Sequence, residues 1–190
     1  MQITHGPVPL LHDYLHQCAR ELSDKIALVC MKQRISYGEL DARSNALANH
    51  LISSGVCRGD RVVVFADNTV ETVVSFWAVL KANAVVSIVN PLTKSDKLSY
   101  LLEDCRPAAL ITDAHIHSVF AEPAQKCAHL RCIIVSGKID DKKFAALPHA
   151  QRWDDALARG DRAVPPARTC IDIDLAAIIY TSGSTGDPKG

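Results

Sequence analysis

Val62-Val63-Val64-Phe65-Ala66 is a short, unbroken apolar run that decides the fold class of this 190-residue chain. A run of this length is typical of a β-strand that is buried on both faces of a parallel sheet. Asn68 and Glu71 follow it at the spacing of a helix N-terminal cap. The helix that they predict has one apolar face, formed by Val70, Val73, Val74 and Trp77. A buried strand followed by such a helix indicates an α/β fold.

Strands and helices alternate in the same way through the middle of the chain. Strands are expected at residues 84–89, 108–112 and 132–135, and helices at 95–105 and 116–128. Crossovers of this kind join parallel strands, so we predict a largely parallel sheet with flanking helices. Residues 137–169 are richer in charge and proline, and we expect a surface excursion there with one short helix around 153–158. A last buried strand is expected at 175–180.

The amino-terminal part has a different pattern. Leu11, Leu15, Cys18 and Leu22 stand at helical spacing and predict an opening amphipathic helix. Residues 26–31 and 35–37 are apolar runs around a short polar turn, which predicts a small β-hairpin. Ser36 and Glu39 then have the spacing of a capping box, and the helix that they open is expected to end at Gly55.

The charge balance and hydropathy argue against several classes of protein. The chain carries 21 basic and 21 acidic residues, so it has no net field to attract nucleic acid, and no nucleic-acid partner is predicted. No apolar run approaches the roughly 18 residues that a membrane helix needs. The first residues have neither the basic nor the apolar region of a secretory signal, and we expect none.

The cysteines and histidines indicate a reduced, metal-free protein. The seven cysteines are odd in number and include no Cys-x-x-Cys pair, which predicts free thiols in a cytoplasmic protein. Possible metal ligands stand in three pairs: His12 and His16, His115 and His117, and Cys127 and Cys132. None has a third ligand nearby in the sequence, so we interpret them as solvated positions and predict no metal site.

The stretch from Thr181 to Gly190 carries the strongest functional signal. Gly183 and Gly186 permit positive φ angles and a close approach of the backbone to a ligand. Hydroxyl groups surround them, and Lys189 adds a full positive charge. Backbone amides turned inward in such a loop form an anion-binding nest. Because the loop follows a predicted strand, we expect it at the carboxyl edge of the sheet, where it would bind a polyphosphate or nucleotide.

Other phosphate and nucleophile motifs do not fit this loop. Counting from Gly183, Pro188 stands where a Walker A loop has its second glycine. The spacing is not that of a dinucleotide-binding glycine motif either. Neither Ser182 nor Ser184 lies in a G-x-S-x-G nucleophile elbow. We therefore predict that neither serine is a catalytic nucleophile.

The segment from Tyr180 to Gly190 closely resembles the phosphate loop of the adenylate-forming superfamily, which includes acyl-CoA synthetases, luciferases and peptide synthetase adenylation domains. Three upstream segments are similar to other motifs of this superfamily and occur in the same order: Ile35-Ser36-Tyr37-Gly38-Glu39-Leu40, Gly59-Asp60-Arg61-Val62 and Leu80-Lys81-Ala82-Asn83-Ala84. Asn83 stands where the family usually has glycine. Because asparagine also tolerates the left-handed conformation, we expect the turn to be kept.

The resemblance implies an AMP-forming acyl-CoA synthetase or ligase. Such an enzyme activates a small carboxylic acid with ATP and Mg²⁺, releases pyrophosphate, and transfers the acyl group to coenzyme A or to a carrier protein. It also implies that the loop holds the ATP phosphates. The residues that it assigns to this role are Thr181, Ser182, Gly183, Ser184, Thr185, Gly186 and Lys189. Asp187 is expected to face solvent.

The resemblance places this chain in the amino-terminal portion of such an enzyme. We divide one truncated AMP-binding domain into residues 1–58, an element of helix, hairpin and helix, and residues 59–190, a parallel α/β subdomain that ends in the loop. The resemblance implies that the catalytic lysine lies beyond the loop, so no catalytic residue is expected within this chain. The chain alone is expected to be inactive, and the remainder of the enzyme would be its partner. A peptide synthetase adenylation domain and a non-catalytic nucleotide- or partner-binding remnant remain alternatives. Asn90-Pro91 favours the free-standing ligases, since adenylation domains usually carry aspartate before this proline.

Overall fold

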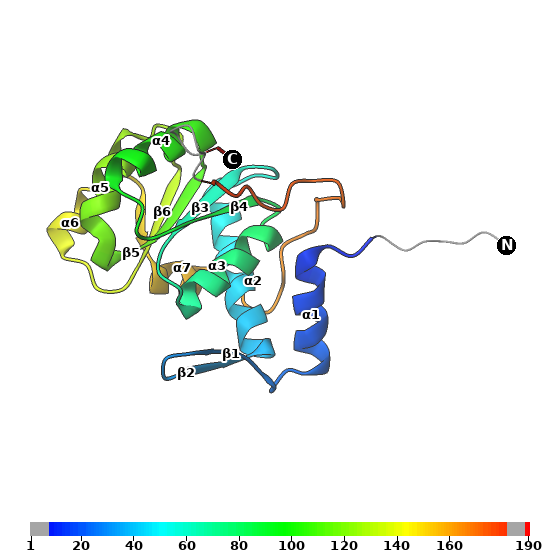
Figure 1. The fold of residues 1–190 in the computed structure, drawn as a ribbon. Coiled ribbons are helices and arrows are strands. Elements are labelled where there is room, and N and C mark those ends of the chain that lie inside the picture. The colour runs from blue at the N-terminus through cyan, green and yellow to red at the C-terminus, as the bar shows by residue number, and fades with distance from the viewer. Residues whose placement is uncertain (1–7, 182–188) are drawn as a thin grey trace.

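A five-stranded parallel sheet forms the centre of the computed structural model, which describes residues 8–181 and 189–190 (Figure 1). Its strands are β3 (Arg61–Phe65), β4 (Val85–Val89), β5 (Ala109–Asp113), β6 (Cys132–Ser136) and β7 (Ala150–Arg152). They lie side by side in the order β4-β3-β5-β6-β7, and every neighbouring pair is parallel. The predicted class, a largely parallel α/β sheet, is therefore confirmed.

Helices cover both faces of the sheet. The helices α2 (Tyr37–Ser53), α3 (Val70–Lys81) and α7 (Trp153–Arg159) pack on one face, and α4 (Ser95–Cys105) and α5 (His117–Lys126) on the other. Alternate residues of each strand serve the two layers, as the pleat requires. On β3, Val62 and Val64 point toward α2 and α3, whereas Val63 and Phe65 pack against α4 and α5. All four side chains are fully buried, which explains the unbroken apolar run.

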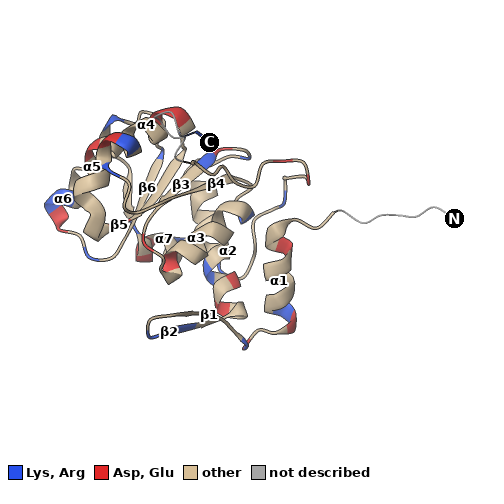
Figure 2. Cartoon of the chain, in the orientation of Figure 1, with Lys and Arg blue, Asp and Glu red and all other residues tan. Residues whose placement is uncertain are grey.

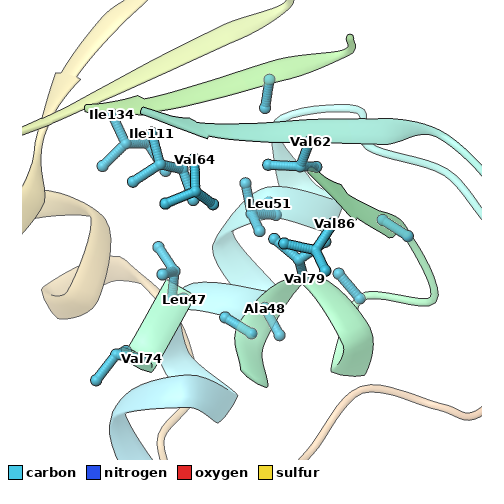
Figure 3. Packing of buried hydrophobic residues seen from close by; sticks show 14 of the residues in the cluster. Leu47, Ala48, Leu51, Val62, Val64, Val74, Val79, Val86, Ile111 and Ile134 are labelled. Atoms are coloured by element: carbon cyan, nitrogen blue, oxygen red, sulfur yellow. The ribbon is translucent and has the colours of Figure 1, made fainter. Parts of the chain in front are cut away.

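The layer beneath α2 and α3 is a close-packed set of aliphatic side chains (Figure 3). Leu47 and Leu51 of α2 lie against the valines of β3, and Ile111 and Ile134 extend the contact across β5 and β6. Truncating one buried leucine in such a layer to alanine costs about 2–5 kcal/mol. The packing of this layer therefore fixes the position of α2 on the sheet.

The amino-terminal elements lie beside this sandwich. Helix α1 (Leu11–Glu21) packs on α2, and the antiparallel hairpin of β1 (Ile26–Cys30) and β2 (Gln33–Ser36) forms a separate two-stranded sheet. The predicted helix and hairpin are thus confirmed. The cap of α2 is also confirmed, because the Ser36 side chain accepts a hydrogen bond from the Glu39 amide at 3.3 Å. The Asn68 cap is wrong: Thr69 precedes α3, and no side chain caps it.

The region predicted as a surface excursion contains more structure than expected. It holds α6 (Asp141–Ala145) and the fifth strand, β7, before the expected helix α7. Strand β7 has three residues, Ala-Gln-Arg, and all three are half-buried at the edge of the sheet. Such a short edge strand needs no apolar run, so these residues carry no strand signal.

The expected buried strand at residues 175–180 is wrong. This segment meets the sheet only through a parallel bridge between Ala177 and Val86 of β4. The Val86 amide donates to Ala176 at 3.0 Å, and the Ile178 amide donates to Val86 at 2.9 Å. Leu175 is 67% exposed and Ile179 is 74% exposed. The segment lies beside the edge strand β4. Within residues 8–181, no helix or strand covers its outer side.

Charges are spread over the molecule without a single-sign face. Acidic and basic residues both occur on α1, α4, α5 and α6 (Figure 2). The core strands carry almost none of them. Within the part of the chain that the structure describes, no helix has the length and hydropathy to cross a bilayer.

Candidate phosphate-binding site

The two ends of the predicted phosphate loop are held together. Thr181 and Lys189 form an antiparallel bridge in which the Thr181 amide donates to Lys189 at 3.0 Å and the Lys189 amide donates to Thr181 at 3.2 Å. Both residues are exposed. The backbone bridge therefore holds the two ends of the predicted loop together. The other predicted site residues, Ser182, Gly183, Ser184, Thr185 and Gly186, lie outside the described residues.

The base of the loop contacts helix α4 and the segment that precedes the loop. The Tyr180 hydroxyl donates a hydrogen bond of 2.5 Å to the Asp104 carboxylate. Burial and this hydrogen bond both raise the pKa of Tyr180, so the phenol stays protonated and remains a donor. A Cβ atom at Gly190 would lie 2.8 Å from Ile178 Cγ2 and 2.9 Å from Tyr180 Cζ. Only glycine fits there without a shift of these neighbours.

A cavity of about 540 Å³ opens beside Thr181. It is bounded by the end of β4, the turn that follows, the start of α4 and Tyr180. Two lysines, Lys94 and Lys97, line it together with Asp96. The carboxyl end of a parallel strand is where open α/β sheets bind ligands, and paired ammonium groups favour an anionic one.

The turn at the mouth of this cavity is built by Asn90. Its side-chain oxygen accepts from the Leu92 amide at 2.9 Å, and its backbone oxygen accepts from the Thr93 amide at 2.9 Å. This Asx turn brings the chain back toward α4 and sets the position of Lys94. No local pattern in the sequence marks Lys94, Lys97 or Asp104, because their proximity to Tyr180 and Thr181 arises only from the packing of α4.

The turn after α3 adopts the conformation expected of it. Asn83 has a φ of 60°, in the left-handed region. Its side chain is used as well: Nδ2 donates to the Ala167 carbonyl at 3.0 Å, and Oδ1 accepts from the Thr169 and Cys170 amides at 2.8 and 3.0 Å. Asn83 thus holds the connection that leads from α7 toward the loop.

Comparison with known proteins gives a consistent picture. Residues 15–190 match the family described as AMP-binding enzyme. The chain is 32% identical over 182 residues to the nonribosomal peptide synthetase atnA of Emericella nidulans, covering 95% of this chain and 2% of that protein. It is 29% identical over 171 residues to a medium/long-chain-fatty-acid–CoA/3-oxocholest-4-en-26-oate–CoA ligase of Mycobacterium marinum, covering 88% of this chain and 30% of the ligase.

Among solved structures, the chain resembles the anthranilate CoA ligase AuaEII, crystallised with anthranoyl-AMP. The TM-score is 0.84 at 23% identity, and the match covers 93% of this chain and 33% of the ligase. At that identity the likeness establishes the fold. The chain spans a third or less of the length of each of these three proteins.

Proposed function

Since the chain belongs to the AMP-binding enzyme family, we propose that its protein activates a carboxylic acid with ATP. The single observation that carries this proposal is the closed base of the loop, where Thr181 and Lys189 pair beside a cavity lined by two lysines. This arrangement can hold a polyphosphate and a second anion next to each other. A nucleotide and a carboxylate substrate meet that description.

The reaction follows from these two ligands. A carboxylate oxygen attacks the α-phosphorus of ATP, the bond to the bridging oxygen breaks, and pyrophosphate leaves. A thiol then attacks the acyl carbon of the acyl-adenylate, and AMP leaves. Mg²⁺ would accompany the nucleotide and offset its charge.

The loop would hold the β- and γ-phosphates. We assign this role to Thr181, Ser182, Gly183, Ser184, Thr185 and Gly186 through amides and hydroxyls, and to Lys189 through its charge. Hydrogen bonds to charged groups contribute about 1.5–3 kcal/mol each, so a few of them suffice to orient a triphosphate.

We propose coenzyme A as the thiol and therefore an AMP-forming acyl-CoA ligase. Asn90-Pro91 supports this choice, since it resembles the free-standing ligases. The second candidate is a peptide synthetase adenylation domain, which transfers to a carrier protein. The 32% identity to the Emericella peptide synthetase supports it at least as strongly as the 29% identity to the mycobacterial ligase supports the first. The free state of all seven cysteines fits a reducing compartment, and we propose a cytoplasmic location.

The direct test is Lys189→Ala in the full-length protein. Loss of one charge-assisted contact to phosphate should raise the KM for ATP about 10- to 100-fold. The KM for the carboxylic acid should change less than about twofold. Acid-dependent exchange of pyrophosphate into ATP measures both constants.

Lys142→Ala, which removes an exposed lysine from α6, is the matched control and should leave both constants unchanged. Equal loss toward ATP and acid would contradict the phosphate role of Lys189. Acceptor assays with coenzyme A and with a phosphopantetheinylated carrier protein then separate the two candidate functions.

A further inference from the structure

The carboxyl ends of β3 and β5 meet where the order of the strands reverses. From β3 the chain moves outward to β4 through α3 on one face, then returns to β5 through α4 on the other face. The resulting order β4-β3-β5-β6-β7 is the doubly wound order 2-1-3-4-5. Such a reversal leaves a crevice at the carboxyl ends of its two central strands, where open α/β sheets bind ligands.

Three side chains of types that can bind a metal ion meet in this crevice. Asp67 follows β3, Asp113 ends β5, and His115 lies in the 3₁₀ turn η1 (Ala114–Ile116) just after β5. One donor atom from each residue lies within 4.8 Å of the other two. The His115 Nε2 and Asp67 Oδ2 atoms are 3.0 Å apart. The set is a mixed one of two carboxylates and one imidazole.

Neighbouring groups hold the central carboxylate in a fixed orientation. Asp113 is only 6% exposed. One of its oxygens accepts from the Asp67 amide at 2.8 Å, and the other accepts from the Ser136 hydroxyl at the end of β6. Both donors are neutral, and each carboxylate oxygen keeps a further lone pair for a ligand. Outer hydrogen bonds of this kind orient the carboxylates of metal sites.

The surrounding cavity offers room for a hydrated ion. Its volume is about 350 Å³, and Thr69, Glu71 and Lys138 line it together with the three donors.

We propose that Asp67, Asp113 and His115 bind one divalent transition-metal ion of the Zn²⁺ type. Two carboxylate oxygens and one imidazole nitrogen are ligands that Zn²⁺ accepts, and three protein ligands leave a position open for water. Glu71 lies in the same cavity as an additional acceptor. The site differs from the phosphate loop in residues and in strands, so it does not depend on the proposed function. It departs from the sequence-based prediction of no metal site.

The test uses the full-length protein stripped of metal with a chelator, and Co²⁺ as the spectroscopic stand-in for Zn²⁺. The wild type should bind one equivalent of Co²⁺ with visible d–d absorption, and Zn²⁺ should displace it. Asp67→Asn and His115→Gln remove exposed donors, so the fold should survive; each should raise the Kd for Co²⁺ at least tenfold. Asp172→Asn and His129→Gln make the same chemical changes at exposed positions elsewhere and should leave the Kd unchanged.

Circular dichroism confirms that each variant is folded before titration. Absence of saturable Co²⁺ or Zn²⁺ binding in the wild type would overturn the proposal. So would equal affinity in the Asp67 and His115 variants, a thiolate charge-transfer band that places the ion on cysteine, or binding of Mg²⁺ alone.

Discussion

At the scale of single residues, Lys81 shows how a charge can be part of the core. The residue is 4% exposed, yet its ammonium group is fully paired. Four acceptors lie within hydrogen-bond distance of its three N–H groups: the Asp41 carboxylate at 2.7 Å, the Asp41 carbonyl at 3.1 Å, the Ser44 hydroxyl at 2.8 Å and the Asn45 side-chain oxygen at 2.7 Å. Burial lowers its pKa, and the Asp41 carboxylate opposes that shift. All of these acceptors lie on α2, so Lys81 joins the end of α3 to α2.

Lys81→Met should destabilise the protein strongly. The substitution keeps an unbranched apolar side chain but leaves the Asp41 carboxylate buried without the Lys81 cation, which costs about 3–5 kcal/mol in such pairs. Tryptophan fluorescence during urea unfolding of the chain at low concentration measures the loss. Adding Asp41→Leu should recover part of it, because the unpaired charge is then gone. A loss below about 1 kcal/mol in the single variant would contradict this account.

The buried histidine His50 makes stability depend on pH. His50 is 4% exposed, and burial lowers the pKa of its imidazole from the ordinary value of 6.5. Between the lowered pKa and 6.5, the unfolded chain binds a proton that the folded chain does not. The free energy of unfolding should therefore fall as the pH drops below 6.5, by up to about 1.4 kcal/mol per pH unit. His12, whose pKa burial also lowers, adds a slope of the same sign.

His50→Gln should flatten that slope. The comparison is the free energy of unfolding at pH 7.5 and at pH 5.5, for the wild type and for the variant. The carboxylates with lowered pKa values, such as Glu39, lose their contribution only below their ordinary value of 4.5, outside this window. An unchanged difference between the two pH values in His50→Gln would show that His50 does not cause it.

At the scale of elements, the turn after α3 does two things at once. The left-handed φ of Asn83 ends the helix, and its amide side chain holds residues 167–170 against the sheet. Glycine would satisfy the first requirement and not the second. The connection from α7 to the phosphate loop therefore depends on the Asn83 side chain, which lies in the turn after α3.

Asn83→Gly should separate the two effects. The turn is kept because glycine accepts positive φ, but the three hydrogen bonds are lost. Each is worth about 0.5–1.5 kcal/mol, so the loss of stability should be about 1.5–4.5 kcal/mol. Hydrogen exchange should accelerate at the Thr169 and Cys170 amides while the β3 amides remain protected. Equal acceleration in β3 would mean that the turn itself had failed.

At the scale of the whole molecule, apolar side chains gather at the β4 edge of the sheet. They belong to β4, to the turn that follows it and to the segment that bridges to it: Ile88, Leu92, Ile173, Leu175 and Ile179. Exposed apolar clusters beside an unpaired strand promote association. The opposite edge ends in the three-residue β7, whose polar residues protect it.

The 190-residue chain should therefore self-associate at high concentration. Sedimentation velocity should show species heavier than the monomer above micromolar concentrations. The double variant Leu175→Lys/Ile179→Lys places charges on this edge and should shift the distribution toward monomer. Leu22→Lys, at an exposed leucine after α1, is the control. A wild type that stays monomeric at every concentration would contradict the prediction.

The sequence by itself determined the elements in which burial produces a regular local pattern of apolar residues. Strands β3 to β6 and helices α2 to α5 follow from apolar runs and helical periodicity, because burial imposes a local pattern there. The loop was recognisable for a related reason, since a phosphate nest needs glycines and hydroxyls close together in sequence. The roles of its residues stay predictions.

Only the tertiary structure decided which distant residues meet. Strand order, the short edge strand β7 and the exposure of residues 175–180 depend on long-range pairing, which leaves no local pattern. Asp67 and His115 stand 48 positions apart by their numbers, and the parallel pairing of β3 with β5 brings them within 3.0 Å. Lysine side chains usually face solvent, but the packing of α3 on α2 buries Lys81 in the core. These contacts are stabilised by packing between the helix and sheet layers, so no single segment of the chain encodes them.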